Sequence, residues 1–496
     1  MISVAIMFLL LGLVLKYVAV GDQKKPRKLP SPTALPIIGH LHLIGSKSLH
    51  VVLESMSNIF GKVYSLKLGA HHITVLCSQK AMKEAFVKNA KKFSGRPDLP
   101  TFSYTRYGRT GISLCDHSPL YVQNRKRAVQ SLHKFLMNEK NMIGIFQKEA
   151  SKMVALFNQY VSEGKTFNPS HDFERIIPSM FLSIMYGIDL PYLSTDLKEV
   201  SRVYRDWFEV AEADNPADFF PVLQKFPNKR LSVISNCGKE FERFNMDMLR
   251  KELQKPSDEN NNGVNAAPTT ILENLLKNET AESLESEDTC KELAKLVSDM
   301  IGAGFDTIPS TLSWAFIYLS NNPNIVKKCR EELDGLSTDT NNFNYTNKSK
   351  TPYFMATIYE ILRMSCVAPT GVLHKSNEEA LIQGYVIPKN TIVIANLYQM
   401  NFDESTWLKP NELRPERFLN DSNELDSKLC NEIATFSVGT RRCPGDKLAV
   451  AMMYAILGTF IAKYDINMVQ SPIDMQPLRG MTSKPKDFLL QLTHVN

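Results

Sequence analysis

The residues best suited to chemistry surround a cysteine near the C-terminal end of the chain. They form the segment Phe436-Ser437-Val438-Gly439-Thr440-Arg441-Arg442-Cys443-Pro444-Gly445. Proline suits the first position of a helix, and a helical pattern follows over residues 446–460, so Cys443 is predicted at a helix N-terminus. Peptide dipoles there favour a thiolate, the form of cysteine that binds metals. Gly439 and Gly445 let the backbone approach a bound group and donate to the sulfur, and Phe436 would shield it.

A second candidate segment lies within a helical pattern from about residue 287 to residue 320. Asp306 and Thr307 form an acid–alcohol pair in an apolar helix, and such a pair can relay protons through water. The small residue Ala303 leaves room beside the helix. Pro309 lacks an N–H, and its ring clashes with the carbonyl of Phe305, so we predict a local kink. The alternative, that the glycines here only pack the helix, leaves the acid–alcohol pair unexplained.

Both segments resemble motifs of the cytochrome P-450 superfamily. Residues 436–445 match its haem-binding signature FxxGxRxCxG at all five fixed positions, and residues 303–307 resemble its (A/G)GxDT motif. The resemblance implies a haem b cofactor with Cys443 as the axial ligand of the iron. An electron-rich thiolate favours cleavage of dioxygen at haem iron. A buried structural cysteine is the usual role of an isolated cysteine, but this context argues against it.

The resemblance also implies which side chains hold the cofactor. Arg441 and His374 are expected at the haem propionates. The family usually has WxxxR on a helix that faces the propionates, and the best match here starts with Tyr121 and ends with Arg125. Because tyrosine replaces tryptophan, Arg127 is the alternative to Arg125.

Three further charged residues match motifs with a structural role. Glu360 and Arg363 fit ExxR, whose positions i and i+3 share one helix face. Arg417 belongs to Pro415-Glu416-Arg417-Phe418, which fits the PERF motif. The resemblance implies a Glu–Arg–Arg cluster that braces the core under the haem and does no chemistry.

The N-terminus is predicted to anchor the protein in a membrane. Residues 2–20 are nearly all apolar, with Lys16 as the only charge, and about 19 helical residues span roughly 28 Å, close to the bilayer core. A basic cluster follows the apolar run and none precedes it, which favours an uncleaved anchor with a cytosolic body over a cleaved signal. We therefore expect an anchor at 1–20, a basic and proline-rich hinge at 21–40 and one catalytic domain at 41–496.

Bulk properties fit one large, mainly α domain with small β-sheets. The 496 residues are 43% hydrophobic and 22% charged. The net charge is +6, but there is no long basic tract outside the N-terminus and no zinc-finger spacing, which argues against nucleic-acid binding. None of the eight cysteines forms a CxxC pair, so a disulfide framework is not expected. Strand-like runs occur at 63–68, 73–77, 386–387, 391–395 and 488–492.

The resemblance to the microsomal class implies a monooxygenase of the endoplasmic reticulum membrane. It would take electrons from NADPH through NADPH–cytochrome P-450 reductase, with cytochrome b5 as a second candidate donor. The substrate must be apolar, and a sterol or steroid is favoured over a xenobiotic or a fatty acid. A haem-thiolate sensor would not need Asp306 and Thr307. The expected lining segments are Asp98–Ser113, Phe208–Gln224, Met300–Thr307, Thr370–Leu373 and Gly480–Ser483.

Overall fold

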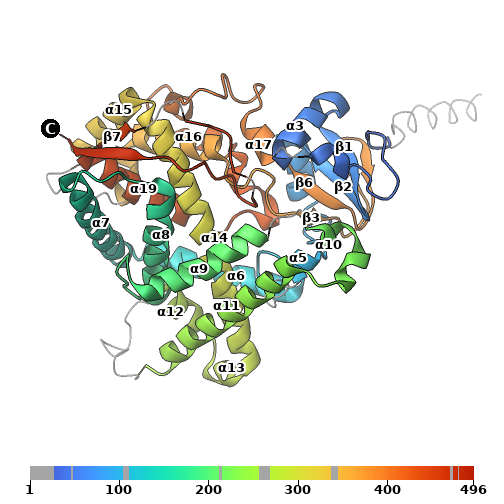
Figure 1. Ribbon diagram of the computed structural model, residues 1–496, viewed down its shortest axis with the longest axis horizontal. Coiled ribbons are helices and arrows are strands. Elements are labelled where there is room, and N and C mark those ends of the chain that lie inside the picture. The colour runs from blue at the N-terminus through green and yellow to red at the C-terminus, as the bar shows by residue number, and fades with distance from the viewer. Residues whose placement is uncertain are drawn as a thin grey trace, which may run out of the picture.

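Helices make up most of the protein, and the small sheets lie at two opposite sides of it (Figure 1). The computed structural model describes residues 27–45, 48–103, 111–211, 215–255, 269–336, 345–469, 473–478 and 480–495. The fold class is therefore the mainly α architecture with small sheets that the sequence predicts.

The largest sheet joins a segment near the N-terminus to a segment in the last third of the chain. Its strands are β1 (Val63–Leu68), β2 (His71–Leu76), β6 (Ile392–Ala395) and β3 (His374–Lys375), in the order β1-β2-β6-β3. Strands β2 and β6 are parallel and are separated by more than half of the chain. Apolar side chains of α3 (Leu49–Phe60) pack on this sheet. The sheet thus places His374, a predicted cofactor residue, beside segments from the N-terminal region.

Two smaller sheets complete the β structure. They pair β4 (Ala380–Ile382) with β5 (Tyr385–Ile387), and β7 (Tyr464–Met468) with β8 (Leu490–His494). The five predicted strand runs therefore all fall on strands, with ends shifted by up to two residues. Strands β3, β4 and β7 lack a predicted run because they are short or do not alternate clearly.

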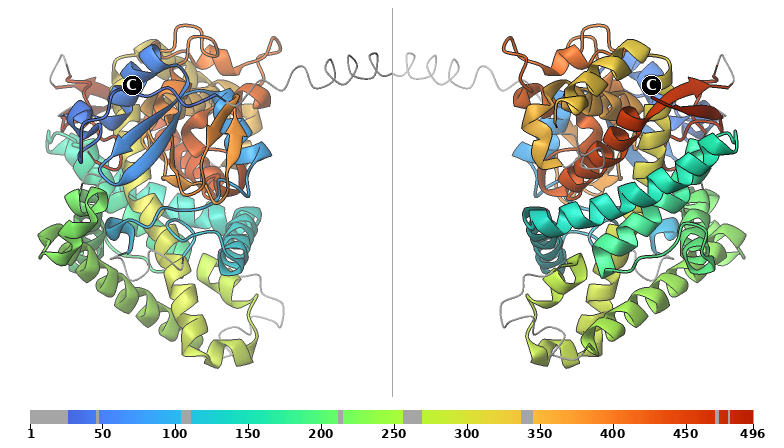
Figure 2. Two further views of the ribbon diagram at one scale, coloured as in Figure 1. Left: turned by 90° about the vertical axis from the view of Figure 1, so that its right-hand side faces the viewer. Right: turned by 90° about the vertical axis from the view of Figure 1, so that its left-hand side faces the viewer.

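A long central helix forms the axis of the helical part of the molecule (Figure 2). This helix, α14 (Glu287–Ser320), has the bounds that the helical pattern predicts. It packs against α8 (Pro169–Tyr186), α9 (Thr195–Val210) and α11 (Lys229–Leu253). Most of its residues from Leu293 to Leu319 are buried, because neighbours surround it on nearly every face.

Three more helices support the predicted cysteine site. They are α6 (Pro119–Met137), α16 (Pro352–Ser365) and α19 (Asp446–Lys463). Helix α19 is apolar around its whole circumference and is buried from Val450 to Ile461. The other helices are α2 (Leu41–Ile44), α4 (Gln79–Lys83), α5 (Pro100–Ser103), α7 (Glu139–Ser162), α10 (Pro216–Phe219), α12 (Ile271–Leu276), α13 (Ala281–Glu285), α15 (Pro323–Asp334), α17 (Leu397–Asn401) and α18 (Ser427–Cys430).

The predicted anchor at 1–20 and the start of the hinge lie outside the described residues. Within the described ranges, no helix combines the length and the apolar character needed to cross a bilayer. The second half of the hinge lies against β1: Ser65 N donates to Pro30 O at 2.8 Å, and Lys67 N donates to His40 Nδ1 at 2.8 Å.

Candidate functional site

Backbone hydrogen bonds fold the cysteine segment into a tight loop. Cys443 N donates to Phe436 O at 2.9 Å, and Arg442 N donates to Gly439 O at 3.1 Å. Gly439 has φ +76°, and a Cβ there would lie 1.8 Å from the carbonyl oxygen of Phe86. Only glycine fits that position, because the loop presses against the backbone of another segment.

Burial of Cys443 opposes the negative charge that a nearby helix N-terminus favours. Helix α19 begins at Asp446 with Gly445 as its N-cap, so Pro444 is not the first helical residue and the cysteine precedes the helix by three residues. Burial raises the pKa of the Cys443 thiol to about 11, against a backbone hydrogen bond from Gly445 and the charges of Arg125 and Arg442, which lower it. A bound metal cation would overcome this desolvation, because coordination deprotonates a thiol.

Two buried guanidinium groups lie close to this loop. Arg441 is 8% exposed, stacks 3.7 Å above the ring of Tyr121 and donates to the carbonyls of Ser94, Ile112 and Cys115. Arg96, which is not among the predicted cofactor residues, is 4% exposed and donates to the carbonyls of Ser113, Val372 and Leu373. Burial, and then the charge of Arg441, lower the pKa of Arg96 to about 9.

This basic cluster fits a cofactor that carries carboxylates. In the described part of the chain, neither Arg96 nor Arg441 forms an ion pair with a carboxylate. Buried charges without counter-charges are costly, so a bound anionic group would stabilise both. The propionates of a haem have the required charge. No local pattern marks Arg96, because its partners come from distant segments.

His374 lies beside the same cluster but is held in a neutral form. Its Nδ1 is 2.7 Å from the carbonyl oxygen of Phe93, so Nδ1 must carry the hydrogen, and its ring stacks on Phe86 at 3.9 Å. Burial and the nearby charges of Arg96 and Arg441 hold its pKa well below the usual value. A neutral ring would leave Nε2 as an acceptor, so His374 would need a second proton to donate to a propionate.

Helix α6 distinguishes the two predicted arginines. Arg125 Nη2 donates to the carbonyl oxygen of Arg442 at 2.5 Å, and Tyr121 Oη donates to that of Thr440 at 2.9 Å. Arg127 instead forms an ion pair with Glu279 at 2.7 Å. Tyr121 and Arg125 therefore face the cysteine loop together, whereas the alternative Arg127 is engaged elsewhere.

The predicted acid–alcohol pair lies on α14, with its two side chains in different surroundings. Asp306 is buried, accepts from Thr482 Oγ1 at 2.5 Å and forms an ion pair with Lys484 at 2.5 Å. Thr307 is partly exposed and donates to the carbonyl oxygen of Ala303 at 2.6 Å. Ala303 is exposed although the helix around it is buried, which indicates a hollow beside this turn. Thr482 falls in the expected lining segment Gly480–Ser483, whereas Lys484 is not among the predicted site residues.

Gly304 has the packing role that the alternative reading assigns to the glycines. A Cβ at this position would lie 2.0 Å from the ring of Phe181 on α8. Phe305 also packs among aromatic rings, with Phe181 and Tyr204 at centroid distances of 6.0 and 4.6 Å. Close packing thus explains Gly304 and Phe305, but not the buried carboxylate of Asp306.

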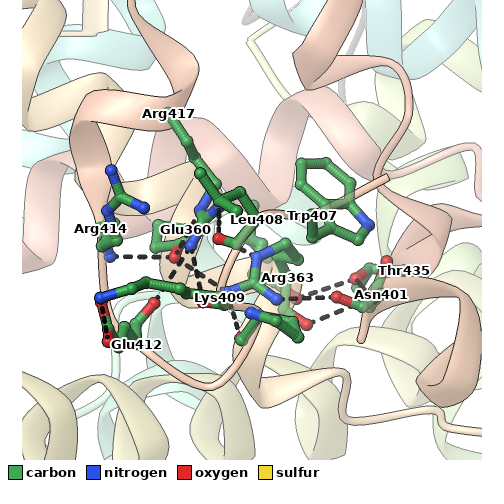
Figure 3. A network of polar contacts seen from close by, with 12 residues as sticks. Glu360, Arg363, Asn401, Trp407, Leu408, Lys409, Glu412, Arg414, Arg417 and Thr435 are labelled. Carbon is green, nitrogen blue, oxygen red and sulfur yellow. Dashed lines mark hydrogen bonds and ion pairs between the residues drawn. The ribbon is translucent and has the colours of Figure 1, made fainter. Parts of the chain in front are cut away.

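The Glu–Arg–Arg cluster forms as predicted (Figure 3). Arg363 donates to both carboxylate oxygens of Glu360 at 2.8 Å, and both side chains are fully buried. Arg417 donates to Glu360 at 3.0 Å. Arg363 also donates to the carbonyl oxygen of Asn401, whose side chain accepts from Ala434 N near the start of the cysteine loop. The cluster therefore connects α16 to that loop.

The fold is mainly α, and the cysteine loop lies beside a buried basic cluster in it, an arrangement that fits a haem-thiolate protein. The family model for cytochrome P450 matches residues 29–492, and the chain belongs to that family. It is a haem b-dependent monooxygenase.

Named relatives span nearly the whole chain. Cytochrome P450 1A2 from Oryctolagus cuniculus is 29% identical over 468 residues, covering 92% of this chain and 89% of the relative. Cytochrome P450 1A1 from Rattus norvegicus is 28% identical, with coverages of 92% and 88%. Cytochrome P450 1A1 from Homo sapiens is 27% identical, with coverages of 92% and 90%.

Proposed function

We propose that this protein inserts one oxygen atom of dioxygen into an apolar small molecule at a haem held by Cys443. The observation that carries the proposal is the constrained cysteine loop beside two buried guanidiniums that pair with no carboxylate of the described residues. Arg96, Arg441 and Arg125 would hold or neutralise the propionates. Haem with a thiolate ligand supplies the activation of dioxygen. Phe436, Gly439 and Gly445 would shape the sulfur side of the site, and Ala303 the opposite side.

Asp306 and Thr307 would handle protons in this reaction. The partial exposure of Thr307 and the burial of Asp306 support different roles for the two side chains. The threonine hydroxyl would contact the hollow beside Ala303, and the carboxyl group of Asp306 would accept protons and pass them on to it. Glu360, Arg363 and Arg417 would support the loop without contacting reactants.

For the substrate we propose a xenobiotic in place of the sterol or steroid expected from the sequence. The relatives reported above are all cytochromes P450 1A, and none is named for a steroid. The electron donor would be NADPH–cytochrome P-450 reductase, with cytochrome b5 as a second candidate. Lys126 and Lys447 are exposed near the cysteine loop and could contact an acidic partner. The site of action would be the endoplasmic reticulum membrane.

The ligand assignment is tested by Cys443→Ala, with Cys430→Ala as the matched control. Cys430 is a partly buried free cysteine outside the loop. Cys443→Ala is expected to abolish the red-shifted absorption band of the reduced carbon monoxide complex and the activity, whereas Cys430→Ala keeps both. If Cys443→Ala retains that band, the assignment is wrong. A reductase-dependent turnover screen over xenobiotics, steroids and fatty acids then identifies the substrate class.

A further inference from the structure

A lysine from the C-terminal region connects the buried Asp306 to solvent. The Asp306 side chain is 4% exposed, and its Oδ1 lies 2.5 Å from Lys484 Nζ. Its Oδ2 accepts from Thr482 Oγ1 at 2.5 Å. The Lys484 side chain is 31% exposed. Among the described residues, Lys484 is therefore the polar partner of this carboxylate that also reaches water.

Contacts with the protein core fix the segment that carries Lys484. Trp314 Nε1, on α14, donates to the carbonyl oxygen of Ser483 at 2.9 Å. Ser483 N donates to the carbonyl oxygen of Val367 at 2.8 Å, and Leu478 N donates to that of Lys484 at 2.7 Å. These bonds hold the backbone beside α14, where the Lys484 ammonium group reaches Asp306.

Charged groups of alternating sign continue from Lys484 towards the surface. Glu174 on α8 lies 4.0 Å from Lys484, and Arg205 on α9 lies 3.9 Å from Glu174. Burial raises the pKa of Glu174, and the charges of Lys484, Arg205 and His171 act in the opposite direction. The row of charges thus runs from α14 through the C-terminal segment to α8 and α9.

We propose that Lys484 controls the delivery of solvent protons to Asp306, an inference that rests on the proposed role of the Asp306–Thr307 pair. Monooxygenation places one oxygen atom of dioxygen in the substrate and releases the other as water, so it consumes two electrons and two protons. The electrons come from NADPH, and the protons come from solvent. When Lys484 gives a proton to Asp306, an Nζ–H bond breaks and an Oδ1–H bond forms. Lys484 then recovers its proton from water or from Glu174.

An ion pair that only fastens the C-terminal segment to α14 would have the same geometry. The two roles separate because arginine keeps the charge but does not release a proton in a protein. Lys484→Arg is therefore expected to preserve the ion pair without restoring proton delivery. Lys484→Met removes both functions. Lys486→Met is the matched control, because Lys486 lies two residues away and pairs with the exposed Asp474.

The experiment uses the haem-loaded, full-length protein with its reductase. Haem content and the reduced carbon monoxide band should be unchanged in all variants. Lys484→Met and Lys484→Arg should both lower the rate of product formation, towards the lower end of the roughly 10²–10⁴-fold that one positioned acid–base group contributes. The ratio of product to NADPH consumed should fall, hydrogen peroxide release should rise, and the solvent deuterium isotope effect should change.

A readout independent of turnover comes from a double-mutant cycle on unfolding stability with Asp306→Asn. Lys484→Met should show coupling to Asp306, and Lys484→Arg should retain wild-type stability. If Lys484→Arg couples NADPH use to product as well as wild type does, the lysine is only a structural partner and the inference is wrong. If Asp306→Asn itself couples normally, the proposed role of the acid–alcohol pair fails first.

Discussion

Two sets of buried charged residues have different roles in this protein. The carboxylate of Glu360 neutralises Arg363 within the chain, and the remaining donors of Arg363 bind carbonyl oxygens. Within the described ranges, the hydrogen-bond acceptors of the Arg96 and Arg441 guanidiniums are carbonyl oxygens, so their charge remains available to an anionic group. Breaking the neutralised pair would leave a buried charge uncompensated, whereas the unneutralised guanidiniums would gain from a bound anion.

Breaking the neutralised pair should destabilise the protein strongly. Glu360→Gln leaves the fully buried Arg363 without its counter-charge, and we expect a loss of about 3–5 kcal/mol in the free energy of unfolding. Lys409→Gln is the control, because it removes an exposed pair with Glu412 and should cost no more than about 1 kcal/mol. Denaturant unfolding of both variants measures the difference, and equal effects would contradict the structural role.

The buried His50 should make stability depend on pH. Burial lowers its pKa to about 4, and its ring packs 4.7 Å from that of Tyr398. Below the unfolded value of about 6.5, the unfolded chain binds a proton that the folded chain does not, so stability falls as the pH decreases towards 4. Its contribution between pH 7 and pH 5 is roughly 2 kcal/mol. His50→Phe should remove this part of the pH dependence. The free energy of unfolding of both proteins is measured between pH 7 and pH 5, and an equal decrease in the two would refute the prediction.

At the scale of elements, α14 contributes many buried core residues and also carries Asp306 and Thr307, the pair proposed to handle protons. Hydroxyls of Thr307, Ser310, Thr311 and Ser313 each donate to the carbonyl oxygen four residues earlier. Such bonds compete with the helical ladder and often bend helices, and Pro309 lies among them. The kink predicted at Pro309 stays a prediction.

Removing the Thr307 hydroxyl should uncouple the reaction while sparing the fold. Its partner is a backbone carbonyl, so Thr307→Ala should keep haem and bind substrate. Product formation should fall by about 10²-fold or more, with NADPH still consumed. Thr307→Ser keeps the hydroxyl and should retain coupling. The ratio of product to NADPH measures the effect, and normal coupling in Thr307→Ala would assign the relay to another group.

At the scale of the whole molecule, the main sheet brings early and late segments together. Strand β2 pairs with β6, and Arg27 in the hinge forms a bridge with Tyr385. The hinge is therefore bound to the catalytic body from Arg27 onward. A membrane anchor at residues 1–20 would hold the body at a set orientation.

The predicted cytosolic orientation can be tested through glycosylation. The sequons at Asn278, Asn344, Asn347 and Asn420 should remain unmodified, because the glycosylation machinery is lumenal. Asn278 and Asn420 already form side-chain hydrogen bonds in the folded protein. Mass spectrometry before and after glycosidase treatment checks this expectation. A glycosidase-sensitive mass shift at any sequon would contradict the predicted orientation. Deletion of residues 2–20 should weaken membrane attachment.

Several features could be predicted from the sequence because short stretches of chain encode them. Helical periodicity and the terminal Asn-Asn-Pro give α14 its bounds, and the ten-residue spacing around Cys443 indicates a thiolate loop. The i, i+3 spacing of Glu360 and Arg363 similarly brings them together within one helix turn.

Tertiary structure alone decided which distant side chains complete the site. Arg441 binds a carbonyl 347 residues away in sequence, and Thr482 reaches Asp306 across 176 residues. Arg96 and Lys484 also contact residues that are distant in sequence, and no local periodicity or spacing marks either one. The start of α19 at Asp446 was predictable from the local helical pattern, but the hydrogen bond from Cys443 N to Phe436 O, which closes the loop before it, was not. Local propensity determines elements, but burial and charge compensation depend on neighbours that only the folded chain brings into contact.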